Sequence, residues 1–124
     1  MRGPGYLGDE AGAAAVEFSL VFSAFVMFIV GSFYLAGMLF VGSSMQFATQ
    51  AAARCASVDT TNCASNAAVQ TYAASKYSGG RLATPAFVAT TPTCGHKVDA
   101  SVTYVFDVGM RKINVPLTAT SCFP

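Results

Sequence analysis

The chain has 124 residues, of which 53% are hydrophobic and 10% are charged, and its formal net charge is +1. Charged residues make up about 25% of a typical soluble domain. Much of the apolar surface of this small chain therefore belongs in a lipid bilayer rather than in a globular core. The near-neutral charge excludes the basic surface by which a protein attracts nucleic acid, and we expect no nucleic-acid partner.

The composition changes abruptly near the N-terminus. Residues 1–12, MRGPGYLGDEAG, are rich in glycine and predict a segment without regular structure. The 25 residues over 18–42 carry no charge. At about 1.5 Å rise per residue, a helix of this length crosses the roughly 30 Å hydrocarbon layer of a membrane. The uncharged run continues to Ala53, so we predict one long helix over residues 13–54, transmembrane over about 18–42.

Two other kinds of apolar segment fit this stretch less well. A secretory signal peptide has a basic start and an apolar core of about 7–15 residues. This apolar run is longer than that. The segment before it is not basic, because it contains Arg2 together with the acidic Asp9 and Glu10. A core helix of a soluble protein would carry charges on its outer face over such a length. We therefore adopt the membrane-spanning interpretation.

The remainder of the chain predicts a small mixed domain over residues 55–124. A second helix is expected over about 64–77, with Asn62 or Ser65 as its N-cap and the Gly-Gly pair at 79–80 as its stop. Its expected inward residues are Ala68, Val69, Tyr72 and Ala73.

An alternating pattern, typical of strands, follows the second helix. We expect a short strand over 87–91, the clearest strand over 97–108, and a third over 111–120. Pro116 cannot donate to a strand ladder, which favours an edge position for the third strand. The expected apolar faces consist of Val98, Ala100, Val102, Tyr104, Phe106 and Val108, and of Ile113, Val115, Leu117 and Ala119. The predicted fold class is α+β, with a two- or three-stranded antiparallel sheet packed on a helix.

The four cysteines, Cys55, Cys63, Cys94 and Cys122, all follow the apolar segment. An even count on one side of a membrane span predicts two disulfides in an oxidising compartment. Among the three possible connectivities we favour Cys55–Cys63, which closes a short loop, and Cys94–Cys122, which ties the sheet to the C-terminus. A four-cysteine zinc site is the alternative, but thiolate zinc sites usually have close C-x-x-C pairs and this sequence has none. We expect no metal.

The residues needed for enzymatic chemistry are missing from the sequence. His96 is the sole histidine and lies in a polar turn, and Asp99 and Asp107 fall on the outer strand face as solubilising charges. No phosphate-binding loop, nucleotide fingerprint or nucleophile elbow is present. The sequence therefore predicts no catalytic residue, no cofactor and no enzyme.

A single carboxylate stands where the apolar helix begins. Glu17 is the only charged residue between Ala11 and Ala53, and a carboxylate at the edge of hydrocarbon costs a few kcal/mol unless it is paired or neutralised. One interpretation is an interfacial carboxylate that interacts with the positive end of the helix dipole, with no processing of the chain. The other interpretation depends on the residues that flank Glu17.

The stretch GAAAVEF over residues 12–18 looks like the cleavage motif of type IV pilin-like proteins. The longer segment over about 12–57 more closely resembles the TadE-like pseudopilins of tight-adherence (Tad) pili. The core of this resemblance is the run from Ala14 to Phe18, together with Ala-Ala-Ala-Arg at 51–54.

The resemblance implies roles for three residues. Gly12 would be the last leader residue, cut on the cytoplasmic side by a prepilin peptidase, and Ala13 would become the new N-terminus. Glu17, then the fifth residue of the mature chain, would pair with the N-terminal amine of a neighbouring subunit. Electrostatics agrees, because a new ammonium at Ala13 supplies a counter-charge at the same depth, and pairing in a low dielectric is favourable.

The resemblance also implies a minor pilin or pseudopilin that acts as a structural subunit in pilus assembly, adhesion or secretion. Its partners would be a prepilin peptidase, other pilins, the inner-membrane assembly platform and the lipid bilayer. The weakly basic leader says little about orientation. The cysteines place the C-terminal domain in the periplasm and the N-terminus in the cytoplasm, with a further location in an extracellular pilus. The alternative function is an unprocessed, membrane-anchored periplasmic binding module.

Overall fold

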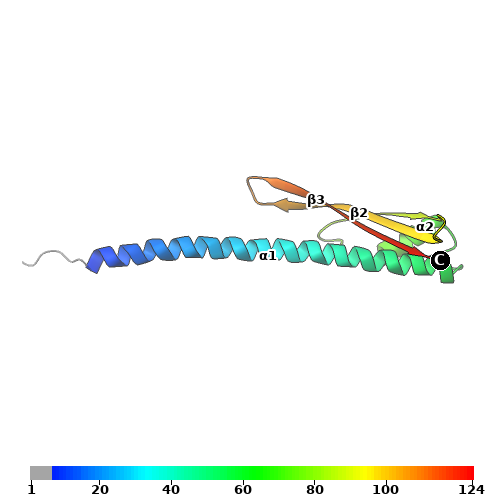
Figure 1. Ribbon diagram of the computed structural model, residues 1–124, viewed down its shortest axis with the longest axis horizontal. Helices are drawn as coiled ribbons and strands as arrows, with labels where there is room; N and C mark the ends of the chain where they lie inside the picture. The colour runs from blue at the N-terminus through cyan, green and yellow to red at the C-terminus, as the bar shows by residue number, and fades with distance from the viewer. Residues whose placement is uncertain (1–6) are drawn as a thin grey trace, which may run out of the picture. The chain divides into compact units, whose positions relative to one another are not determined.

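The computed structural model describes residues 7–124 and confirms the predicted α+β architecture (Figure 1). Its elements are α1 (Leu7–Val58), α2 (Asn66–Lys76), β1 (Ala86–Thr90), β2 (His96–Asp107) and β3 (Lys112–Phe123). The three strands form one antiparallel sheet in the order β1-β2-β3. The chain divides into two compact units, one ending at Leu35 and the other running from Ala36 to Pro124.

Helix α1 is longer than predicted at both ends. The prediction of no regular structure over residues 1–12 is wrong for 7–12, which are helical, whereas residues 1–6 lie outside the described residues. Once a helix has nucleated, each added residue gains a backbone hydrogen bond, and Glu10 in the first turn suits the positive end of the helix dipole. At the other end the helix passes Arg54 and stops at Val58.

The first unit is an apolar helix in which three serine hydroxyl groups donate to the helix's own backbone. Ser19 donates to the Val16 carbonyl at 2.8 Å, Ser23 to the Ser19 carbonyl at 2.7 Å, and Ser32 to the Phe28 carbonyl at 2.8 Å. Its exposed apolar residues surround the helix and include Val16, Phe18, Leu20, Val21, Phe22, Phe25, Met27, Phe28, Phe33 and Leu35. Within the described residues, α1 is the one helix long and apolar enough to cross a membrane. Such a surface suits lipid, where backbone and hydroxyl groups need partners within the helix.

The last part of α1 belongs to the second unit and forms one wall of its core. Its buried face follows helical spacing and consists of Val41, Met45, Ala48, Thr49, Ala52, Ala53 and Ala56. Ala52 and Ala53 pack in one cluster with Val69 of α2 and Val98 of β2. Small side chains on this face let the neighbouring elements approach the helix closely.

A close contact fixes the other end of the sheet on α1. A Cβ atom at Gly37 would lie 2.5 Å from the Tyr104 hydroxyl oxygen, so glycine leaves room for the tyrosine. The Tyr104 side chain is buried, and its ring meets Phe106 edge-on with 5.1 Å between centroids.

Helix α2 agrees with its predicted range to within two residues at each end. The Ser65 side chain is the N-cap and accepts a hydrogen bond from the Ala68 N–H, which agrees with one of the two predicted caps. The helix ends at Lys76, one residue before the predicted end at about Tyr77, because Tyr77 already has an extended backbone. The Tyr77 hydroxyl donates to the Ala83 carbonyl at 2.8 Å, and this contact with the following loop replaces a further helical turn.

The strands follow the predicted alternation over most of their length. β2 pairs with β1 only over residues 97–101, but with β3 along its whole length, from His96 opposite Phe123 to Asp107 opposite Lys112. The edge position predicted from Pro116 is confirmed by the strand order. The predicted core face extends too far, because Val108 and Ile113 are exposed. β1 pairs with β2 only as far as Ser101 and does not reach the end of the β2–β3 hairpin.

Two disulfides, Cys55–Cys63 and Cys94–Cys122, join elements of the second unit. The first closes the loop after α1, and the second links the turn before β2 to the last part of β3. This is the connectivity that the order of the cysteines favours.

Replacing Met45 with alanine is expected to lower the free energy of unfolding by about 2–5 kcal/mol, the usual cost of a large buried cavity. Met45 is fully buried, whereas Met110 is fully exposed, so Met110→Ala is the matched control and should change little. Urea unfolding of the full chain in detergent micelles, followed by tyrosine fluorescence, measures both variants. Equal midpoints for the two variants would contradict the placement of Met45 in the core.

Candidate functional site

The predicted processing motif lies in the first turns of α1. Gly12, Ala13 and Glu17 are all helical and exposed. Ala13 and Glu17 are four residues apart, so they lie on the same helix face, one turn from each other. Within the part of the chain that the structure describes, the Glu17 carboxylate has no hydrogen bond or ion pair. The Glu17 carboxylate therefore lies at the start of a long apolar surface and has no counter-charge.

Gly12 has no packing reason to be glycine. A Cβ atom built there meets nothing within 4 Å, and its backbone φ is not among the positive values that favour glycine. By contrast, Gly37 accommodates Tyr104. A glycine inside a helix costs about 0.5–1 kcal/mol relative to alanine. No packing contact at position 12 offsets this loss of helix stability.

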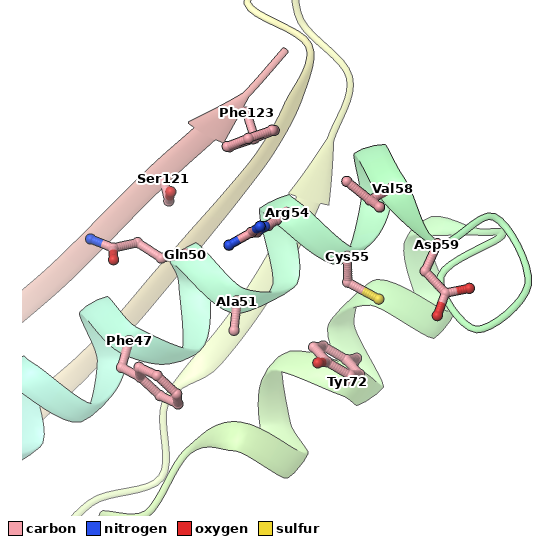
Figure 2. Close-up of a pocket in the computed structure, with 10 residues that line it drawn as sticks. All are labelled: Phe47, Gln50, Ala51, Arg54, Cys55, Val58, Asp59, Tyr72, Ser121 and Phe123. Atoms are coloured by element: carbon pink, nitrogen blue, oxygen red, sulfur yellow. The ribbon is translucent and has the colours of Figure 1, made fainter.

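A groove of about 730 Å³ lies at the other end of α1, against α2 and β3 (Figure 2). It is lined by Phe47, Gln50, Ala51, Arg54, Cys55, Val58, Asp59, Tyr72, Ser121 and Phe123. Figure 2 shows Gln50 and Arg54 on the side of α1 toward Ser121, and Tyr72 on the α2 side. Among the described residues, the Arg54 guanidinium has no ion pair. The groove thus combines apolar walls with one available cation.

The carboxylate of this groove is already engaged in the chain. Asp59 accepts hydrogen bonds from the Asn62 side-chain amide at 2.7 Å and from the backbone N–H groups of Thr61 and Asn62 at 3.0 Å. The hydrogen bond from the Asn62 side chain, with the two backbone bonds, lowers the pKa of Asp59 below its ordinary value. Asp59 therefore organises the loop closed by the Cys55–Cys63 disulfide.

The polar residues of the sheet have structural partners. The Thr120 hydroxyl donates to Asp99 at 2.7 Å, and Lys97 lies 3.0 Å from the other carboxylate oxygen. The hydrogen bond from Thr120, together with Lys97, lowers the pKa of Asp99. His96 is half-buried as the first residue of β2. Within residues 7–124, no group of three His, Cys, Asp or Glu side chains is placed to hold a metal ion.

Comparison with known families bears on the helix that carries the processing motif. The family model for TadE-like proteins matches residues 12–54. This segment is TadE-like. The TadE-like match begins at Gly12 and ends at Arg54, so it includes the motif, the apolar helix and most of the core wall. Searches of curated proteins and of solved structures found no match to the chain.

The TadE-like match suggests a pilin-like protein associated with a Tad pilus. One N-terminal apolar helix suited to a membrane is consistent with a membrane-anchored pilin. The sequence analysis identified the motif because its residues are adjacent in the chain. It missed the groove, because Phe47, Tyr72 and Phe123 come together only through packing and share no local pattern.

Proposed function

We propose that this chain is a minor pilin or pseudopilin of a Tad-type pilus, with its leader removed between Gly12 and Ala13 by a prepilin peptidase. The observation that carries the proposal is the unpaired Glu17 carboxylate, one helical turn from Ala13 and followed by an apolar surface. A buried charge without a partner is costly, and a paired one is much less so. Cleavage would create the missing partner.

The low local stability of the helix around Gly12 also supports this assignment. The Gly12–Ala13 bond lies in the second turn of α1, and helix ends fray. Glycine lowers the local helix stability further, by about 0.5–1 kcal/mol. A local opening at Gly12 therefore costs less than it would deeper in α1, and it would present the bond to the peptidase.

Assembly would follow from side-by-side packing of these helices. In the membrane, the new ammonium at Ala13 of one subunit would pair with Glu17 of its neighbour, and the apolar surfaces would pack laterally. The assembly platform would then extract the subunits into a fibre that acts in adhesion or secretion. The disulfide-bonded unit would face the periplasm, where an oxidising environment maintains both bonds.

The N-terminus of the mature protein tests the cleavage directly. We expect mass spectrometry of the membrane fraction from the native host to find a chain that begins at Ala13. Cells that lack the prepilin peptidase serve as the control and should contain the chain that begins at Met1. Recovery of only the full-length chain from cells with an active peptidase would overturn the proposed processing.

A second function is favoured by one observation, the groove that contains the unpaired Arg54. An unprocessed, membrane-anchored module could bind an anionic periplasmic ligand there. The same mass spectrometry separates the two functions, because a binding module keeps its leader and a pilin loses it.

A further inference from the structure

The outer edge of β3 carries backbone groups that no described strand pairs. β3 is the last strand in the order β1-β2-β3. In the part of the chain that the structure describes, no backbone-to-backbone hydrogen bond outside the sheet ladder involves residues 112–123. A free strand edge presents a row of N–H and C=O groups that can pair with another extended chain. The edge of β3 is therefore a template for a further strand.

Alternation along the β2–β3 hairpin identifies the backbone groups of this edge. The Val108 N–H donates to the Arg111 carbonyl at 3.2 Å, so these two residues form a hydrogen-bonded pair. Such pairs alternate with non-hydrogen-bonded pairs in an antiparallel ladder, and the register is unbroken along both strands. The even-numbered residues of β3 therefore point their N–H and C=O groups away from β2. Pro116, which has no N–H, is one of them. Beyond it, the outward donors are the N–H groups of Thr118, Thr120 and Cys122.

The groove of about 730 Å³ lies beside this part of the edge. Ser121 and Phe123 line it from β3, and Gln50 and Arg54 line it from α1 (Figure 2). A strand added to β3 would point alternate side chains toward the face of the sheet that bears Ser121 and Phe123. Those side chains would enter the groove. In this mode of recognition, backbone pairing provides affinity and the alternate side chains provide specificity.

The lining of the groove favours one carboxylate flanked by apolar side chains. Arg54 is exposed, and among the described residues its guanidinium has no ion pair. Phe47, Val58 and Phe123 are large apolar residues of the same groove that remain exposed. Side chains on one face of a strand recur every second residue, about 7 Å apart. An acidic residue that faces Arg54 would therefore bring the residues two positions away to the apolar parts of the groove.

We propose that the free edge of β3 and this groove bind an extended segment of another protein with the pattern apolar-x-acidic-x-apolar. The backbone of the segment would pair with β3 beyond Pro116, and its acidic side chain would pair with Arg54. Its apolar side chains would cover Phe47 and Phe123. The edge from Leu117 to Phe123 is about 23 Å long at 3.3 Å per residue, which is enough for this pattern. The proposal uses the second unit alone, so it rests on neither cleavage nor membrane anchorage.

A second copy of this chain lacks the charge that the site requires. Its two edge strands, β1 and β3, contain no Asp or Glu, so edge pairing between copies would leave Arg54 without a carboxylate. The acidic residues of the second unit already have partners in their own chain: Asp59 with Asn62, Asp99 with Thr120, and Asp107 with Lys112. The occupant is therefore a different protein with an available acidic side chain.

Peptide binding to the full chain in micelles of a neutral detergent tests the proposal. The probe is a rhodamine-labelled, end-capped peptide of sequence TLTETLT, in which the Glu and both Leu side chains share one face. The control peptide TLETTLT has the same composition but places Glu on the other face. By fluorescence anisotropy we expect TLTETLT to bind at least about fivefold more tightly, because hydrogen bonds between charged groups are the strong ones. Arg54→Gln should remove this difference. Arg81→Gln changes an exposed arginine outside the groove and should retain it.

Hydrogen exchange measured by NMR locates the bound peptide. In the free protein, the three outward N–H groups beyond Pro116 should exchange faster than their neighbours at 117, 119 and 121, which pair with β2. Adding TLTETLT should slow exchange at the outward groups several-fold. A peptide with N-methyl groups at alternate backbone positions keeps every side chain but loses the strand pairing, and it should bind much more weakly.

Equal affinity for the two peptides, absence of binding at millimolar peptide, or the same effect of both arginine variants would overturn the proposal. So would protection by the peptide only at amides away from β3. Slow exchange at the outward groups that increases with protein concentration, without peptide, would also overturn it, because a second copy would then occupy the edge. None of these results changes the N-terminus found by mass spectrometry, so failure of this proposal is distinct from failure of the proposed function.

Discussion

Replacing Glu17 with glutamine is expected to leave the protein in the membrane and to reduce its incorporation into pili by at least about tenfold. Glutamine keeps the shape of the side chain but removes its charge, so insertion into lipid becomes no harder. Removing one partner of a close, desolvated charge pair costs about 2–5 kcal/mol, and each 1.4 kcal/mol changes association about tenfold. Sheared pili quantified by immunoblot, with the membrane fraction measured in parallel, give both readouts.

Glu10→Gln is the matched control for this experiment. Glu10 lies on the same helix, but the proposed cleavage removes it, so its substitution should leave pilus incorporation unchanged. Normal incorporation of the Glu17→Gln variant would contradict the pairing mechanism. An equal loss with Glu10→Gln would show that the leader still contributes to the assembled state, which contradicts its removal.

Loss of the Cys94–Cys122 disulfide is expected to lower the free energy of unfolding by about 3.5 kcal/mol, and loss of Cys55–Cys63 by about 2.5 kcal/mol, from the loop entropy alone. The difference follows from sequence separations of 28 and 8 residues. These bonds matter here because the core is built largely from small side chains, such as Ala52, Ala53 and Ala73. Such a core buries little apolar area per residue.

Serine pairs replace each disulfide in turn, and urea unfolding of the full chain in micelles measures the loss. Each pair is the control for the other, since both remove two sulfur atoms and differ chiefly in the loop that is released. A larger loss for Cys55→Ser with Cys63→Ser than for the other pair would contradict the loop-entropy account. Free thiols in the protein isolated from its host would contradict the oxidising compartment.

Local patterns in the sequence predicted the type of every element but not all of its ends. The long uncharged run predicted α1, and strict alternation predicted β2. The third strand was expected to end at Thr120, yet β3 continues to Phe123. Its last residues pair with His96 and Lys97, and Cys122 is tied to Cys94. These are long-range contacts, and no local pattern reveals them.

The candidate sites divide in the same way. The motif from Gly12 to Glu17 can be read in the sequence because its residues are neighbours on one helix. The exposure of the end of the β2–β3 hairpin could not be predicted in this way, since alternation alone assigned Val108 and Ile113 to the core face. Their exposure depends on which elements pack on that face of the sheet, and this is a property of the tertiary structure.

The sharing of α1 between the apolar first unit and the core of the second unit has a consequence for proteolysis. Arg54 is exposed and is the only basic residue between Arg2 and Lys76. A trypsin-like cut after Arg54 would free residues 55–124 without the helix that carries Val41 and Met45. The released piece would lose one wall of its core and unfold. A cut that releases the second unit with its core intact must therefore fall on the N-terminal side of Val41.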